Sequence, residues 1–80
     1  MRTAAEAIRE AMITLGGEAD IREVQAWVEK RYPRQWLPGT IAVLMADLAY
    51  PGNRSSHYPT GRRFLIRVRA GRYRLRTASD

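Results

Sequence analysis

The sequence has 80 residues, a net charge of +6 and no cysteine. A chain of this length buries only roughly 60% of its unfolded surface, so we expect one domain over residues 1–80 with a small core. The lack of cysteine excludes disulfides and thiolate metal sites, so apolar packing must stabilise the fold. The N-terminus has no long apolar run, so we predict neither a signal peptide nor a membrane span and expect a cytoplasmic protein.

The first two helices are predicted from capping signals and apolar spacing. Thr3 with Glu6, and Asp20 with Glu23, have the spacing of capping boxes. The first helix should end at Gly16-Gly17 and the second before Pro33. The apolar stripes that support them are Ala5, Ile8, Met12 and Leu15, then Val24, Trp27, Val28 and Tyr32.

A third helix is predicted over residues 38–49. Pro38 suits its first position, because the fixed backbone angle of proline fits the helix and its missing N–H would have been unpaired there. The spacing predicts a buried stripe and a second face of small, weakly polar side chains, which suits close approach to a DNA groove. The buried stripe is Ile41, Leu44, Met45 and Leu48, and the second face is Gly39, Thr40, Val43, Ala46 and Asp47.

Residues 51–61 are predicted to form a loop, because turn-forming residues dominate there and no period is present. Loops of this length in small domains commonly carry function. Side chains that form hydrogen bonds are concentrated in it, namely Asn53, Arg54, Ser55, Ser56, His57 and Tyr58.

Alternation then predicts a two-stranded ribbon, with a hairpin connection at residues 69–71. We expect one apolar face in the core and five arginines on the other face. A lone hairpin is marginal in water, so it must pack against the helices, and Glu18-Ala19 is suited to a third, very short strand. The expected apolar side is Phe64, Ile66, Val68, Tyr73 and Leu75, and the arginines are Arg67, Arg69, Arg72, Arg74 and Arg76. Three helices followed by a hairpin predict an α+β winged helix-turn-helix fold, with the third helix in the major groove and the hairpin as a wing on phosphates.

Charge is divided unevenly along the chain. Residues 1–31 hold five basic and six acidic side chains, a net charge of −1, whereas residues 32–80 hold nine arginines and two aspartates, a net charge of +7. Arginine binds phosphate through a bidentate fork, so this half is expected to bind a polyanion. The candidate phosphate contacts are Arg34, Arg54, His57, Arg62, Arg63, Arg67, Arg69, Arg72 and Arg74. A solvated strand face whose arginines protect the sheet edge is the alternative interpretation.

The residues offer little for catalysis. His57 is the only histidine, and Asp47 stands without a second acid nearby in the sequence. Metal hydrolysis, acid–base catalysis and a catalytic triad each need more members than this. We therefore predict that the chain is not an enzyme and uses no metal, cofactor or small-molecule substrate. Among the aromatic residues, Trp27, Tyr32, Phe64 and Tyr73 are expected in the core, whereas core and site remain equally open for Trp36 and Tyr58.

The Pro38-Gly39-Thr40 helix start and the Asn53 to Tyr58 loop are the more specific marks of a similarity that covers nearly the whole chain. With these marks the chain resembles winged-helix domains fused to prokaryotic, modification-dependent restriction endonucleases and, more loosely, HARE-HTH domains. The resemblance implies binding of double-stranded DNA, and in some such domains a reading of adenine methylated on its exocyclic amine. The matching positions for that reading site are Trp36, Pro38, Thr40, Asn53, Ser55, Ser56 and Tyr58. No nuclease domain accompanies them, so a standalone reader and a domain excised from a larger nuclease both fit.

Two hypotheses from different classes follow. The first is a nucleoid-associated, monomeric module that binds duplex DNA through residues 38–49, sharing base or methyl contacts between Gly39, Thr40, Val43, Asp47 and the following loop. The second is a protein-interaction winged helix that docks an acidic partner. RNA is a weaker third, because the exposed aromatics are too few for a stacking platform.

Overall fold

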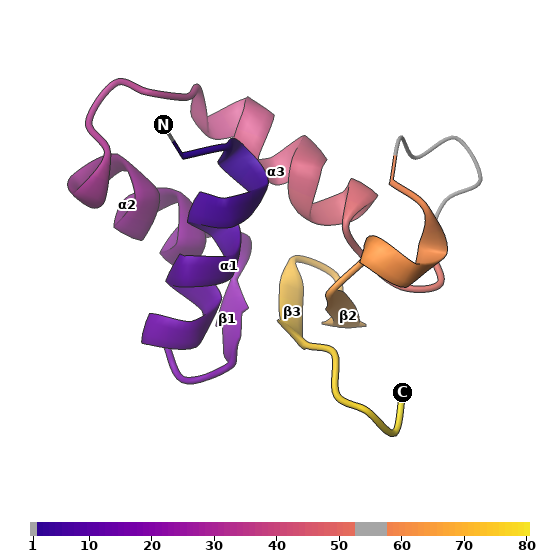
Figure 1. Ribbon diagram of the computed structural model, residues 1–80. Helices are drawn as coiled ribbons and strands as arrows, with labels where there is room; N and C mark the ends of the chain where they lie inside the picture. Colours follow the sequence, from indigo (N-terminus) through magenta and orange to yellow (C-terminus); the bar gives the residue numbers. More distant parts are fainter. Residues whose placement is uncertain (1, 53–57) are drawn as a thin grey trace.

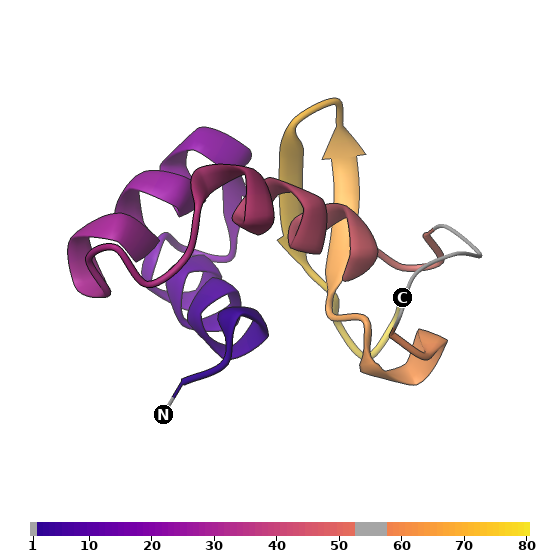
Figure 2. The same ribbon diagram turned by 90° about the horizontal axis from the view of Figure 1, so that it is seen from above.

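Three helices pack beside a small antiparallel sheet (Figure 1). The computed structural model describes residues 2–52 and 58–80. Within them the order is α1, β1, α2, α3, a short 3-10 helix η1 (Thr60–Arg62), β2 and β3. This is the α+β layout of a winged helix, as the sequence predicted, with α3 lying across the face of the hairpin (Figure 2).

The helix α1 spans Ala4–Thr14 and begins at a complete capping box. The Glu6 amide donates to Thr3 Oγ1 at 3.2 Å, and the Thr3 amide donates to Glu6 Oε1 at 2.8 Å. The charge-assisted bond to Thr3 lowers the pKa of the Glu6 carboxyl below its ordinary value. Gly16 and Gly17 both have φ of 92°, so they supply the left-handed exit that leads into β1.

The strand β1 (Glu18–Asp20) and the helix α2 (Ile21–Arg31) follow without a gap. The Asp20 amide donates to Glu23 Oε1 at 2.9 Å, which is the reciprocal half of the predicted cap. The strand β1 is the predicted third strand, and it is one residue longer than the expected Glu18-Ala19.

The helix α3 spans Pro38–Asp47 and so ends two residues earlier than predicted. The chain turns after Leu48 because it joins the hairpin, where the Tyr50 amide donates to the Leu65 carbonyl at 2.7 Å and the Leu65 amide to the Leu48 carbonyl at 3.2 Å. These two bonds attach the end of α3 to the first strand of the wing.

The sheet has the order β1-β3-β2, with β2 at Leu65–Arg69 and β3 at Arg72–Leu75. Gly71 has φ of 77°, so it takes the left-handed position in the predicted hairpin connection. Ala19 pairs with Tyr73, which pairs with Arg67 on the other side. Because paired residues share a face, Arg67 lies on the helix-facing side of the sheet.

The predicted division of β2 between core and solvent is wrong. Leu65 is the fully buried residue, Phe64 and Ile66 are half-buried, and Val68 is 46% exposed. The register aligns Leu65 with Leu75, and a bulge between Arg67 and Arg69 shifts the alternation near the hairpin tip. The five arginines therefore do not line one common face.

The core lies between the three helices and the helix-facing side of the sheet. Its largest fully buried side chains are Ile8, Met12, Val24, Ile41, Met45, Leu48 and Leu65. Leu15 and Leu44, which were predicted in the stripes of α1 and α3, are only half-buried against this core. Tyr73 is buried as predicted, and Trp27, Tyr32 and Phe64 pack half-buried against this core. None of the helices in the described part of the chain has the length and apolar character needed to span a lipid bilayer.

Candidate nucleic-acid interface

The outer face of α3 is exposed and almost without charge. Thr40 and Ala46 are exposed and Val43 is 63% exposed, whereas Ile41 and Met45 on the opposite side are buried. Pro38 and Gly39 are exposed at the start of the helix, and Asp47 is half-buried at its end. The helix therefore presents the small face that the spacing predicted.

An arginine lies beside the C-terminal end of this face. Arg67 and Ala46 line one groove of about 370 Å³, together with Tyr50 and Tyr73. The position of Arg67 follows from its pairing with Tyr73, which turns the side chain toward α3 rather than toward the outer face of the sheet. Its guanidinium has no hydrogen-bond or ion-pair partner among residues 2–52 and 58–80.

A second arginine lies at the start of α3. Arg34 lines a groove of about 380 Å³ with Trp36, Leu37 and Pro38. Its backbone has φ of 58°, and its amide donates to both carboxylate oxygens of Glu29, at 3.2 and 3.3 Å. Glu29 therefore holds the backbone of Arg34, while no side-chain partner for the guanidinium occurs in the described chain.

Trp36 and Leu37 differ in how far they reach the surface. The Trp36 ring is half-buried and packs edge-on against Tyr32, with centroids 5.9 Å apart. Leu37 is 74% exposed immediately before α3. Trp36 thus has a packing role that accounts for much of its surface, and its edge lines the groove that contains Arg34.

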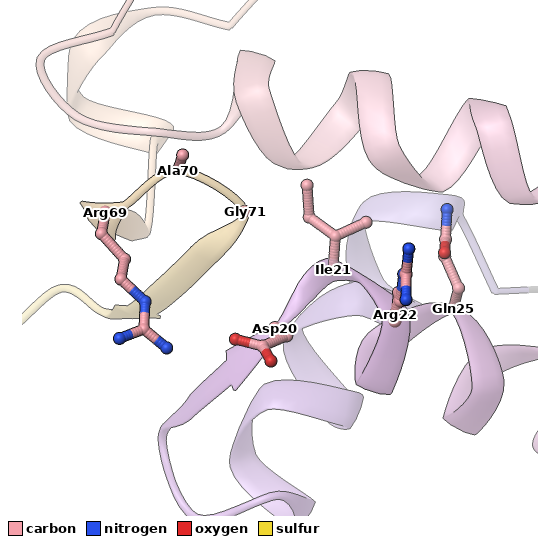
Figure 3. Close-up of a pocket in the computed structure, with 7 residues that line it drawn as sticks. All are labelled: Asp20, Ile21, Arg22, Gln25, Arg69, Ala70 and Gly71. Carbon is pink, nitrogen blue, oxygen red and sulfur yellow. The ribbon is translucent and has the colours of Figure 1, made fainter.

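A third groove, of about 500 Å³, separates the hairpin tip from the first turns of α2 (Figure 3). Arg69 approaches it from the hairpin, and Arg22 and Gln25 approach it from α2. Gln25 also connects this groove to α3, because its Nε2 donates to the Pro38 carbonyl at 2.8 Å. Arg22 and Arg69 are exposed and have no side-chain partner in the part of the chain that the structure describes.

Arg72 and Arg74, both predicted to contact phosphates, are held by carboxylates. Arg72 Nε lies 2.6 Å from Glu18 Oε2, and Arg72 Nη1 lies 3.0 Å from Asp20 Oδ1. Arg74 forms a two-pronged pair with Asp80, at 2.8 and 2.9 Å. These bonds raise the pKa of both guanidinium groups and lower the pKa of Asp80 well below its usual range. Arg72 thus connects β3 to β1, and Arg74 connects β3 to the C-terminal turn. Because their guanidinium groups are bound to carboxylates, we no longer count them among the candidate phosphate contacts.

Arg63 and Arg76 also have internal roles. Arg63 is only 7% exposed; its Nε donates to the Tyr58 carbonyl at 2.9 Å and its Nη1 to the Pro51 carbonyl. The guanidinium carbon of Arg76 lies 3.7 Å from the centre of the Tyr50 ring. The prediction of Arg63 as a phosphate contact is therefore corrected, because its donors bind the carbonyls of Pro51 and Tyr58 inside the fold.

The remaining predicted residues divide into two groups. Tyr58 is half-buried against the core, and Arg62 is exposed on η1. The predictions for Asn53, Arg54, Ser55, Ser56 and His57 lie outside the described residues. The described ranges contain no group of three or more histidine or acidic side chains placed to hold a metal ion.

Sequence reasoning missed Arg22 and Gln25. Both lie in the half of the chain whose net charge is −1, and neither belongs to a capping or apolar pattern. The helix-turn-helix prediction itself contained a usable signal, since the start of the second helix lies near the third helix in that arrangement. The structure places Arg34 and Arg67 in grooves at the two ends of α3, and Arg22 and Arg69 in the groove between α2 and the hairpin tip.

Comparison with protein families gives one result. A family model described as a domain of unknown function, DUF7669, matches residues 2–75. Searches against curated proteins and against solved structures gave no match. The match covers almost the whole winged helix, from the cap of α1 to the end of β3. The chain therefore belongs to the DUF7669 family.

Proposed function

We propose that this domain binds double-stranded DNA, with α3 in the major groove and arginines of the wing and of the flanking segments on phosphates. One observation carries the proposal. The exposed face of α3, which contains Thr40, Val43 and Ala46, is bordered at its two ends by arginines without side-chain partners in residues 2–52 and 58–80.

The physical argument has two parts. A major groove accepts an α-helix, and small side chains allow the helix to approach the base edges closely. The arginines at the two ends of that helix have no side-chain partner in residues 2–52 and 58–80, so their guanidinium groups are available to phosphates on either side of the groove. Around the hairpin, Glu18 and Asp20 share Arg72, and Asp80 is paired with Arg74, so these arginines reduce the negative potential that a phosphate would meet.

In this proposal the domain is a binding module and not an enzyme. Among the described residues, the interface offers guanidinium donors, the Thr40 hydroxyl and methyl groups, which suit binding and base contact. Thr40 is the exposed hydroxyl on α3, and Val43 and Ala46 present methyl groups beside it. These groups favour apolar contact with a methyl in the groove, on thymine or on a modified base.

Methylated adenine is the finer form of the proposal. Val43 is 63% exposed and uncharged on the α3 face, so it offers an apolar contact to one additional methyl group in the groove. The test compares two duplexes of the same sequence that differ only in N6-methylation of one adenine. Tighter binding of the methylated duplex would support methyl reading, and equal affinities would remove it while leaving DNA binding intact.

A protein-docking function is the second candidate, and exposed apolar side chains favour it. Leu37 is 74% exposed and lies one residue before α3, on which Val43 is also exposed. Apolar residues of this kind commonly anchor protein interfaces. Titration of labelled random-sequence duplex in 50 mM salt separates the candidates. Saturable binding supports DNA, and absence of binding would refute it in favour of a protein partner.

A further inference from the structure

We propose that the groove between the hairpin tip and α2 holds the sugar-phosphate backbone of one DNA strand, with Arg22 and Arg69 as its paired cations. This inference rests on the proposed function and extends it, because Arg22 lies outside both the recognition helix and the wing. It converts the hairpin tip and α2 into two sides of a single backbone clamp (Figure 3).

Backbone contacts fix the two sides of the groove relative to each other. The Ile21 amide, at the first position of α2, donates to the Gly71 carbonyl in the hairpin connection at 2.8 Å. β1 and β3 pair directly beside it, with Asp20 opposite Arg72. The two elements that carry Arg22 and Arg69 are therefore fixed relative to each other before any ligand arrives, which reduces the entropy lost on binding.

The two arginines are available for an anion. Both are exposed, they come from elements far apart in the sequence, and neither has a side-chain partner in the described ranges. In Figure 3 they lie on opposite sides of Ile21 and Asp20, so each would donate hydrogen bonds to a different phosphate of the same strand. Gln25 adds a neutral side chain whose amide already bonds to the Pro38 carbonyl.

The acid that borders the groove is ion-paired with Arg72. Asp20 faces the gap in Figure 3, but its Oδ1 lies 3.0 Å from Arg72 Nη1. The same guanidinium lies 2.6 Å from Glu18 and 3.6 Å from Glu23, so three carboxylates share one arginine. Arg72 thus acts as a positioning residue, because it reduces the negative potential that a phosphate would meet at this edge and connects β3 to the start of α2.

The location also fits the proposed docking of α3. Gln25 links the groove to the first residue of α3, so a strand lying in the groove would pass directly beside the N-terminal half of the recognition helix. Arg34 and Arg67 lie in two other grooves along the same helix. A duplex seated on α3 would then have its backbone contacted at three separate places.

Duplex binding by four variants tests the clamp, using Arg22→Ala, Arg69→Ala, the double variant and Lys30→Ala as control. Lys30 is exposed on the last turn of α2, so its removal changes the net charge equally without touching the groove. The slope of log affinity against log salt is negative, and each single groove variant should make it shallower by about 1 unit. The double variant should make it shallower by about 2 units. Unchanged urea midpoints would show that the variants remain folded.

A methylphosphonate scan then locates the contact. Neutral linkages replace single phosphates in turn along each strand of the duplex, and wild type should lose affinity most at a few positions. The double variant should lose its sensitivity at two of these positions, on one strand, while retaining the others. If wild type binds duplex but the groove variants keep its slope and its scan profile, the clamp is refuted and DNA binding stands. If wild type does not bind duplex at all, the proposed function fails and the clamp fails with it.

Discussion

Arg34 combines a left-handed backbone conformation with a side chain placed at the start of α3. Its φ of 58° is uncommon for a residue with a Cβ atom, and its amide is fixed by the Glu29 carboxylate. Left-handed conformations cost L-residues roughly 1–2 kcal/mol relative to the right-handed region, whereas glycine adopts them readily. An arginine kept at such a position is consistent with a role for its guanidinium outside the fold.

Substitution at Arg34 separates that role from stability. Arg34→Gly should raise the free energy of unfolding above that of Arg34→Ala by about 1 kcal/mol, because only alanine retains the strain. Both variants should bind duplex DNA more weakly than wild type, by a similar factor. Urea unfolding and duplex titration measure the two effects. An alanine variant as stable as the glycine variant would contradict the strain, and wild-type affinity in both would remove Arg34 from the interface.

Arg63 is the opposite case, an arginine used inside the fold. Arg63→Met should lower the free energy of unfolding by about 1–3 kcal/mol, because the carbonyls of Pro51 and Tyr58 lose their donor. The neighbouring Arg62→Met is the matched control, since that side chain is exposed and should change stability by no more than about 0.5 kcal/mol. Equal urea midpoints for the two variants would contradict the internal role of Arg63.

The elements differ in how much of them local sequence determines. The starts of α1 and α2 follow from Thr3 and Asp20 with an acid three residues later, so the capping pattern predicts them without tertiary information. β2 begins after Phe64 within a run of three apolar residues, and alternation cannot decide which of the three is buried. Cross-strand pairing with Leu75 and the bulge after Arg67 decide it in favour of Leu65.

Long-range pairing explains why the candidate site was only partly predictable. The acids that hold Arg72 lie 54 and 52 residues earlier in the chain, in β1, so composition alone could not remove this arginine from the phosphate set. Arg67 was correctly expected to be exposed, yet on the wrong side of the ribbon. The face of α3 was predictable, because helical spacing alone places Thr40 and Val43 away from the core.

The exposed face of α3 yields a test at the scale of the element. Val43→Glu should weaken duplex binding at least about tenfold, because it places a carboxylate against the base edges and phosphates of the groove. The free energy of unfolding should change by no more than about 0.5 kcal/mol, since the side chain is 63% exposed. Ile13→Glu is the matched control, as Ile13 is 59% exposed on α1. Equal loss of affinity in both variants would exclude a specific role for the α3 face.

At the scale of the whole molecule, net charge is a poor guide to the binding surface. Nine arginines give residues 32–80 a net charge of +7, but Arg63, Arg72, Arg74 and Arg76 form internal contacts. The arginines left around α3 are Arg34, Arg67 and Arg69, joined by Arg22 from the other half of the chain. The protein thus uses part of its positive charge to hold a small fold together and part to form one surface.

The salt dependence of duplex binding tests this division most directly. If the four arginines around α3 each neutralise one phosphate, log affinity should fall against log salt concentration with a slope of about −3 to −4. Fluorescence anisotropy of a labelled duplex between 50 and 300 mM salt measures the slope. A slope in that range supports binding through the described surface, whereas no binding in 50 mM salt would contradict it.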